Sequence, residues 1–247
     1  MNGVIIILLQ ELCLIINVLI CFGIPIGGFL LIRKKGQHLL KPFLVGMSAF
    51  FISQILIRLP ILQFILPHFL WFERFQYAKI PYFLFLGFTA GIFEETARLI
   101  FFKLFLKDHY QLYDGLAFGL GHGGIEAMLL VGLNAIAYLI LNPLGKAGLE
   151  TTDSLSILAG GIERIFAITY HVGATLLILY GIRQGKSILF TLFAILLHGI
   201  LDSGSIILLD VLHFSNWWVE ICLMFFSTFV LLIGLRLFGV RWKKKSS

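Results

Sequence analysis

Two adjacent glutamates and an arginine lie inside an otherwise apolar segment, "GIFEETARLIFF" at residues 91–102. Glu94 and Arg98 are four residues apart, so a helix would place them on one face. An ionisable side chain in hydrocarbon is costly unless it is paired or faces a wet cavity. Two neighbouring carboxylates do not both stay ionised cheaply in a low dielectric, and Arg98 neutralises only one of them. These residue types therefore indicate acid–base chemistry at Glu94 or Glu95.

Two acid–histidine pairs repeat the spacing of four. His122 and Glu126 lie in "GLGHGGIEA", His198 and Asp202 lie in "HGILD", and His171 lies in a further apolar run. At a rise of about 1.5 Å per residue, the glutamates and histidines lie about 12 to 18 Å from the cytoplasmic ends of their expected helices. One buried histidine is often only a hydrogen-bonding core residue, but several acids and histidines at one depth favour a site. We therefore expect four helices to enclose one polar cavity.

The elements that must position these residues are membrane-spanning helices. Of the 247 residues, 59% are hydrophobic and 13% are charged, and the mean hydropathy of +0.98 excludes a soluble globular protein. Apolar runs long enough to cross a bilayer recur along the chain. We expect an all-α polytopic protein in which residues 1–247 form one membrane-embedded domain. About seven spans are predicted, at residues 3–32, 42–66, 80–106, 114–141, 157–182, 187–209 and 217–238.

The positions of Lys and Arg predict the orientation. Basic residues follow the first, third, fifth and seventh expected spans and are sparse in the other loops. The positive-inside rule therefore predicts an outer N-terminus and a cytoplasmic C-terminus. Because this rule also explains the net charge of +6, no nucleic-acid partner is indicated, and the three isolated cysteines indicate neither a disulfide framework nor a metal knuckle. We expect a multi-pass integral protein in the lipid bilayer of a prokaryotic plasma membrane.

A buried set of Glu, His and Asp without a nucleophilic Ser or Cys is typical of water activation, by a carboxylate alone or with a metal ion. Zn²⁺ takes three or four N, O or S ligands, and three histidines with Asp202 or Glu126 as a fourth ligand would satisfy it. The predicted metal set is His122, His171, His198 and Glu126. Because no HExxH motif is present, a metal-independent mechanism stays open.

Three short motifs resemble those of a known superfamily. "EETAR", "FGLGH" and "HGILD" are similar to EExxxR, FxxxH and HxxxN or HxxxD of the CPBP superfamily, the type II CAAX prenyl endopeptidases and their relatives. In "EETAR" two residues rather than three precede the arginine, a spacing closer to the PrsW branch and to the YhfC-like membrane peptidases. "GHGGIEA" also looks like the YhfC-like sequences. The resemblance to that family covers nearly the whole chain.

This resemblance implies a CPBP-like helical bundle and an intramembrane endopeptidase acting on a membrane protein or a lipidated peptide. Glu94 would orient or deprotonate the attacking water and Arg98 would hold Glu95, although the altered spacing leaves open which glutamate is the base. The residues of the other two motifs would bind the water and the developing oxyanion. The family leaves Zn²⁺ and a cofactor-free glutamic-type mechanism as alternatives. The predicted catalytic residues are Glu94, Glu95, Arg98, His122, His198 and Asp202.

Three other functions share parts of this pattern. A zinc-dependent lipid amidase of the ceramidase and adiponectin-receptor type also has seven spans and three histidines, but gives no reason for adjacent glutamates followed by arginine. A non-catalytic membrane scaffold, like the scaffold subunit of gamma-secretase, would not need to retain the glutamates and histidines. A proton-coupled transporter would use buried Glu and His as relays, but the sequence has no clear repeat or broken helices.

Two finer expectations follow from depth alone. Glu11 and Arg58 both lie about 12 Å below the outer face by the same counting, so we expect a structural ion pair between the first two helices. The polar cavity is expected to be reached from the cytoplasmic half of the membrane.

Overall fold

The computed structural model describes residues 2–141 and 153–239, and all regular structure in these ranges is helical. Short π-helical and 3₁₀ segments, labelled η, connect several of the α-helices into longer rods. In chain order the elements are α1 (Asn2–Val18), η1 (Leu19–Gly23), α2 (Ile24–Arg33), η2 (Gln37–Leu39), α3 (Leu40–Phe50), η3 (Phe51–Arg58), η4 (Ile61–Ile65), η5 (Leu66–His68), α4 (Leu70–Phe75), α5 (Lys79–Phe105), α6 (Leu112–Ala127), η6 (Met128–Gly132), α7 (Leu133–Leu141), α8 (Ser154–Arg183), α9 (Ser187–Asp210) and α10 (Asn216–Leu237).

Six rods in the described part of the chain are long and apolar enough to cross a bilayer. Their bounds agree with six of the expected spans to within a few residues, which confirms an all-α polytopic membrane protein. The rods are Ile5–Arg33, Gln37–His68, Leu112–Leu141, Ser154–Arg183, Ser187–Asp210 and Asn216–Leu237.

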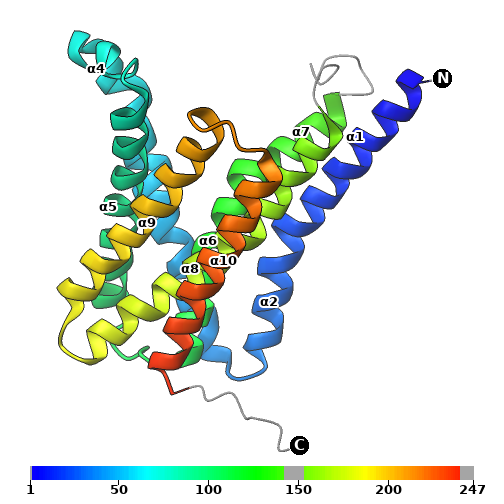
Figure 1. The fold of residues 1–247 in the computed structure, drawn as a ribbon. Coiled ribbons are helices and arrows are strands. Elements are labelled where there is room, and N and C mark those ends of the chain that lie inside the picture. The colour runs from blue at the N-terminus through cyan, green and yellow to red at the C-terminus, as the bar shows by residue number, and fades with distance from the viewer. Residues whose placement is uncertain (1, 142–152, 240–247) are drawn as a thin grey trace, which may run out of the picture.

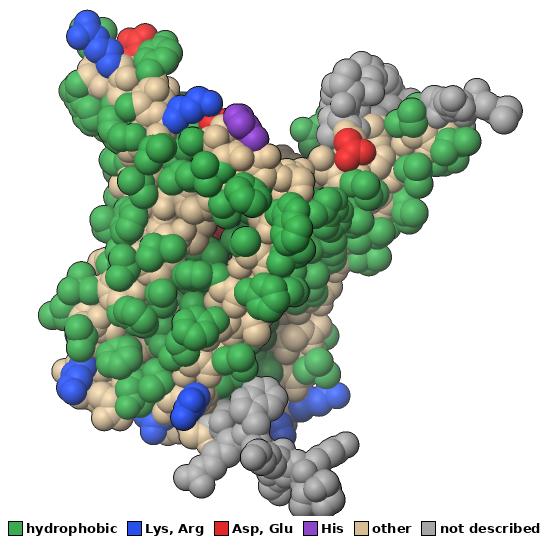
Figure 2. Space-filling model, in the orientation of Figure 1, with side chains coloured by type: hydrophobic (Ala, Val, Ile, Leu, Met, Phe, Trp, Pro, Cys, Tyr) green, Lys and Arg blue, Asp and Glu red, His purple; other side chains and the backbone are tan. Residues whose placement is uncertain are grey.

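The remaining expected span, 80–106, corresponds to α5, which has 27 residues and a length of about 40 Å. It is long enough to cross a bilayer, but the charged residues in its middle make it too polar to count among the six apolar rods. The rod α1–α2 begins at the end of the molecule opposite to that where α10 finishes (Figure 1), which requires an odd number of crossings. Most basic side chains visible in Figure 2 lie at the end where α10 finishes, and the positive-inside rule predicts that this end is cytoplasmic.

Helix α8 forms the centre of the bundle. In its most apolar window 67% of the residues are buried, against 28% or fewer in the other five apolar rods. It packs against α10, α6, α9 and α1, while α5 packs along α9 (Figure 1).

Helices α3 and α6 approach each other closely enough for backbone contact. A Cβ atom added to Gly121 of α6 would lie 2.0 Å from the carbonyl oxygen of Phe43, and one added to Gly46 of α3 would lie 2.2 Å from that of Phe118. Because membrane helices associate through such close packing, these two glycines allow α3 and α6 to pack in direct backbone contact.

Candidate active site

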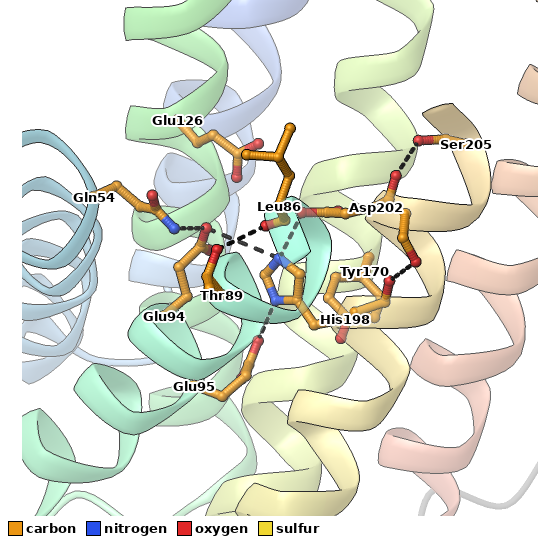
Figure 3. Close-up of polar contacts among 12 residues, drawn as sticks. Gln54, Leu86, Thr89, Glu94, Glu95, Glu126, Tyr170, His198, Asp202 and Ser205 are labelled. Atoms are coloured by element: carbon orange, nitrogen blue, oxygen red, sulfur yellow. Dashed lines mark hydrogen bonds and ion pairs between the residues drawn. The ribbon is translucent and has the colours of Figure 1, made fainter. Parts of the chain in front are cut away.

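The predicted site residues of four helices lie together in the bundle, and Figure 3 shows five of them, Glu94, Glu95, Glu126, His198 and Asp202. Seven of them are linked by contacts that run from α5 to α6, α8 and α9, and Asp202 joins them through His198. The members are Glu94, Glu95 and Arg98 of α5, His122 and Glu126 of α6, His171 of α8, and His198 and Asp202 of α9. The structure thus brings all the predicted residues into one cluster.

Glu95 is held by two partners on opposite sides. Its Oε1 lies 2.8 Å from Nδ1 of His198, and its Oε2 lies 3.3 Å from Nε of Arg98. Arg98 is fully buried and its Nη1 donates to both the backbone oxygen of His171 and Oγ1 of Thr175, each at 2.8 Å. Both carboxylate oxygens of Glu95 are therefore engaged, and Arg98 ties α5 to α8.

Glu94 faces a different set of groups, because successive residues of a helix are rotated by about 100°. Its Oε2 lies 3.0 Å from Nε2 of His122 and 3.9 Å from Nδ1 of His171. Its Oε1 accepts a hydrogen bond of 2.5 Å from Nε2 of Gln54 and lies 3.9 Å from Nε2 of His198. Glu94 is thus the point on which the three imidazoles converge, while Glu95 contacts only one of them.

The contacts of His171 fix its tautomer. Nη2 of Arg98 lies 3.0 Å from Nδ1, and since a guanidinium can only donate, Nδ1 must accept. Nε2 therefore carries the hydrogen, and it lies 2.5 Å from Oε2 of Glu126 as an ion-pair contact. The other oxygen of Glu126 accepts a hydrogen bond of 2.8 Å from Arg164. Glu126 consequently orients the imidazole of His171 from the side opposite Glu94.

The grouping of possible metal ligands differs from the prediction. Among the described residues, Glu94, His122 and His171 form one group whose ligand atoms lie within 4.8 Å of one another. Glu126 is not in this group, and its oxygens contact His171 and Arg164. His198 is not in it either: its Nδ1 faces Glu95, and its Nε2 lies 3.3 Å from Oδ2 of Asp202 (Figure 3). Counting residues along each expected helix placed all of these side chains at the correct depth. It did not give the direction in which each side chain points.

Sequence reasoning missed Gln54, a buried residue of η3 that contacts Glu94. Nη1 of Arg58 donates to Oε1 of Gln54 at 3.0 Å, which requires the amide nitrogen of Gln54 to face Glu94. The remaining nitrogens of Arg58 donate to the backbone oxygen of Leu86 and to Thr89. The predicted pairing of Arg58 with Glu11 is therefore wrong. The sequence feature that could have identified Gln54 is its spacing of four residues from Arg58.

A cavity of about 60 Å³ adjoins the cluster and has room for a few water molecules. Its lining includes Glu94, His171 and His198, and continues to residues of α8, α9 and α10. The more exposed acidic side chains at its edge are Glu163, 39% exposed, and Asp202, 37% exposed. Both lie in the outer halves of their helices, so the expectation of access from the cytoplasmic half is not supported.

Two comparisons find similar sequences. Residues 20–149 and 143–223 match the sequence model of a family described as YhfC intramembrane metalloprotease. A protein of Bacillus subtilis (strain 168) with the name "Uncharacterized membrane protein YhfC" is 31% identical over 210 residues, which is 76% of this chain and 81% of that protein. No solved structure matches the chain. The matched residues include the whole polar cluster.

Proposed function

Since this chain belongs to the YhfC intramembrane metalloprotease family, we propose that it hydrolyses a peptide bond of a membrane-associated substrate, using water activated in its buried polar cavity. The observation that carries the proposal is the convergence of three imidazoles on Glu94 beside a cavity with room for water. A purely structural ion pair would require neither the additional imidazoles nor the cavity. Activation of water by a carboxylate accounts for both.

The donor atoms suit a divalent ion such as Zn²⁺, for which two histidines and one glutamate are an established catalytic ligand set. Glu94, His122 and His171 would hold it. Nδ1 of His122 has no hydrogen-bond partner within the described residues, so a proton can reside there and leave the Nε2 lone pair for a metal. The bond from Arg98 to Nδ1 of His171 is the contact that a metal would displace. When bound, the ion would act as a Lewis acid on the substrate carbonyl and the attacking water.

The proton transfers fall to residues of the chain itself. In the metal-independent route the oxygen of the water bonds to the carbonyl carbon and the C–N bond breaks, while Glu94 takes one proton from the water and gives it to the nitrogen of the departing chain. With a metal ion bound, Glu94 would instead serve as a ligand. His198 is anchored on Glu95 through Nδ1, which leaves Nε2 beside the cavity to donate to the carbonyl oxygen as negative charge develops. Asp202, 3.3 Å from this nitrogen, stabilises the protonated ring. These roles make Glu94 the base and Glu95 a positioning residue.

Replacement of Glu94 tests the peptidase directly. We expect Glu94→Gln to lower the rate of cleavage of single-span reporter proteins, reconstituted with the purified protein in vesicles, by about 10²- to 10⁴-fold. The matched control is Glu220→Gln, which changes another buried glutamate, on α10, whose charged neighbours are Glu163 and Arg164 and not the proposed catalytic residues. New termini are measured by mass spectrometry, with the folded amount of each variant checked. Unchanged cleavage by Glu94→Gln, or release of fatty acid from ceramide-like lipids instead of peptides, would eliminate the proposal.

Metal analysis tests the ligand assignment separately from activity. We expect one equivalent of bound zinc in the purified protein, its loss in His122→Ala and its retention in His198→Ala, because His198 lies outside the ligand group. Full activity of a metal-free protein in the presence of chelators would favour the glutamic-type mechanism. Loss of zinc in His198→Ala would contradict the assignment of ligands.

A further inference from the structure

An apolar groove on the lipid-facing surface between α9 and α10 lies beside the cavity of the candidate active site. The groove has a volume of about 180 Å³. Leu201 and Ser205 of α9 and Leu223 of α10 line both the groove and the cavity, so only these side chains separate the two spaces. Figure 2 shows a small patch of acidic atoms at the bottom of a gap in the hydrophobic surface between these helices. The groove therefore lies between the bilayer and the cavity that holds the carboxylates.

A glycine keeps the groove open. A Cβ atom added to Gly204, which lines the groove, would meet nothing within 4 Å. The neighbouring glycine of α9, Gly199, faces the other way, because a Cβ atom there would lie 2.6 Å from the ring of Phe88 on α5. One face of α9 is thus packed tightly against α5, and the face toward α10 has open space in front of it.

The depth of the groove limits what can occupy it. Its residues span 200–208 on α9 and 219–226 on α10, within about 15 Å of the outer ends of both helices. The groove therefore lies in the outer half of the membrane. A lipid-modified peptide held at the cytoplasmic leaflet does not extend to this level, whereas a membrane-spanning segment passes through it.

The chemistry of the groove favours a helical occupant. Ser205 is the one side chain of its lining with a hydroxyl, and the others are apolar or are Gly204 and Cys222. An extended backbone would have almost no hydrogen-bond partners there, while a helix satisfies its own backbone groups. A membrane-spanning helix can therefore rest in the groove through its side chains until the bond to be cleaved enters the polar cavity.

We infer that the groove between α9 and α10 is the docking surface for a membrane-spanning helix of the substrate, with Leu201 and Leu223 between the docked helix and the cavity. This inference rests on the proposed peptidase function and names its substrate class. It commits the site to proteins that cross the bilayer, and not to lipid-modified peptides of the cytoplasmic leaflet.

A native cysteine makes the docking surface testable by cross-linking. Cys222 is exposed and lines the groove, whereas Cys13 and Cys21 are buried. The probe is a synthetic membrane-spanning helix of Leu and Ala with flanking Lys residues and one central Cys, reconstituted with the full-length Glu94→Gln protein in phosphatidylcholine vesicles. The control carries Cys222→Ser with Leu8→Cys, an exposed position at a similar depth on α1. We expect about tenfold more disulfide at Cys222 than at the control position, a preference of about 1.4 kcal/mol.

A pair of glycine substitutions tests the same surface by blocking it. Gly204→Trp is expected to lower cross-linking at Cys222 about tenfold by filling the groove. Gly160→Trp is the matched control, because a Cβ atom there also meets nothing within 4 Å and Gly160 lines a separate groove beside α1 and α7. This control is expected to leave cross-linking unchanged.

Three outcomes would overturn the inference. They are equal cross-linking at Cys222 and Leu8→Cys, no effect of Gly204→Trp, and stronger cross-linking by a farnesylated soluble peptide carrying one Cys than by the spanning helix. The Glu94→Gln protein reports binding without cleavage. A failed cleavage test with selective cross-linking would therefore remove the peptidase function and leave the docking surface, whereas the reverse result would remove only the docking surface.

Discussion

Gln54 orients the carboxylate of Glu94, and its replacement by methionine is expected to slow hydrolysis about tenfold to a hundredfold. The amide donates to Oε1 of Glu94 at 2.5 Å, and Arg58 prevents the amide from turning over. Methionine keeps the length and volume of the side chain but removes the donor. The Glu94 carboxylate then rotates more freely, and its other oxygen is less often directed at His122 and His171.

The size of the effect follows from the type of bond. A hydrogen bond to a charged group contributes about 1.5 to 3 kcal/mol, and each 1.36 kcal/mol corresponds to a factor of ten in rate. Because Gln54 does not line the cavity, substrate binding should be unaffected and kcat should fall at constant KM. Zinc affinity should also fall by about 10- to 100-fold, as for other residues that orient a metal ligand.

The assay combines cleavage kinetics with zinc competition against a chromophoric chelator, each normalised to folded protein. Ser53→Ala is the matched control, since Ser53 is the buried neighbour of Gln54 and its hydroxyl bonds only within its own helical rod, to the backbone oxygen of Phe50. A loss of folded protein with normal kcat would indicate a packing role. If kcat and zinc affinity of Gln54→Met stay within twofold of the unmodified protein, or if Ser53→Ala lowers them equally, the reasoning is refuted.

Two further substitutions test the contact of Glu126 with His171 and the close packing of α3 against α6. Glu126→Gln removes the charge that holds His171, so zinc affinity should fall about 10- to 100-fold in the chelator assay; unaltered affinity would show that Glu126 does not orient this ring. Gly121→Ala forces a Cβ atom to 2.0 Å from the carbonyl oxygen of Phe43 and should lower the free energy of unfolding by about 1 to 3 kcal/mol. Gly27→Ala meets nothing within 4 Å and should be neutral or slightly stabilising, so equal melting temperatures for both glycine variants would contradict the close contact of α3 and α6.

The spans and the level of the site were predictable because both depend on distance along the chain. The predicted span 157–182 and the observed α8, Ser154–Arg183, differ by three residues at one end and one at the other. Glu94 and His122, on different helices, were expected within a few ångströms of the same depth, and their side chains meet at 3.0 Å. Helical rise converts residue number into depth, so no knowledge of neighbouring helices is needed.

The directions of the side chains were not predictable in the same way, because they depend on which helices are neighbours and how each is rotated about its axis. Glu11 and Arg58 share a depth, but Arg58 is turned toward α5 and bonds to Leu86 and Thr89. Glu126 lies at the level of the histidines, but Arg164 holds it on the outer side of His171. Equal depth is therefore a necessary condition for a contact in a helical bundle and not a sufficient one.

Helix α5 combines the least favourable composition for lipid with the central position in the candidate site. Its charged residues are shielded by the bundle, since Glu94 is 4% exposed and Glu95 and Arg98 are fully buried. The lipid-facing side of the same helix presents Ile92 and Leu104, which are 48% and 60% exposed. A hydropathy window averages both sides of the helix and therefore underestimates how well α5 suits the bilayer. Each buried charge is stabilised by a partner on α5 or on another helix. Removal of one charged side chain therefore leaves its partner's charge uncompensated in a low dielectric, so these residues must be retained as a set.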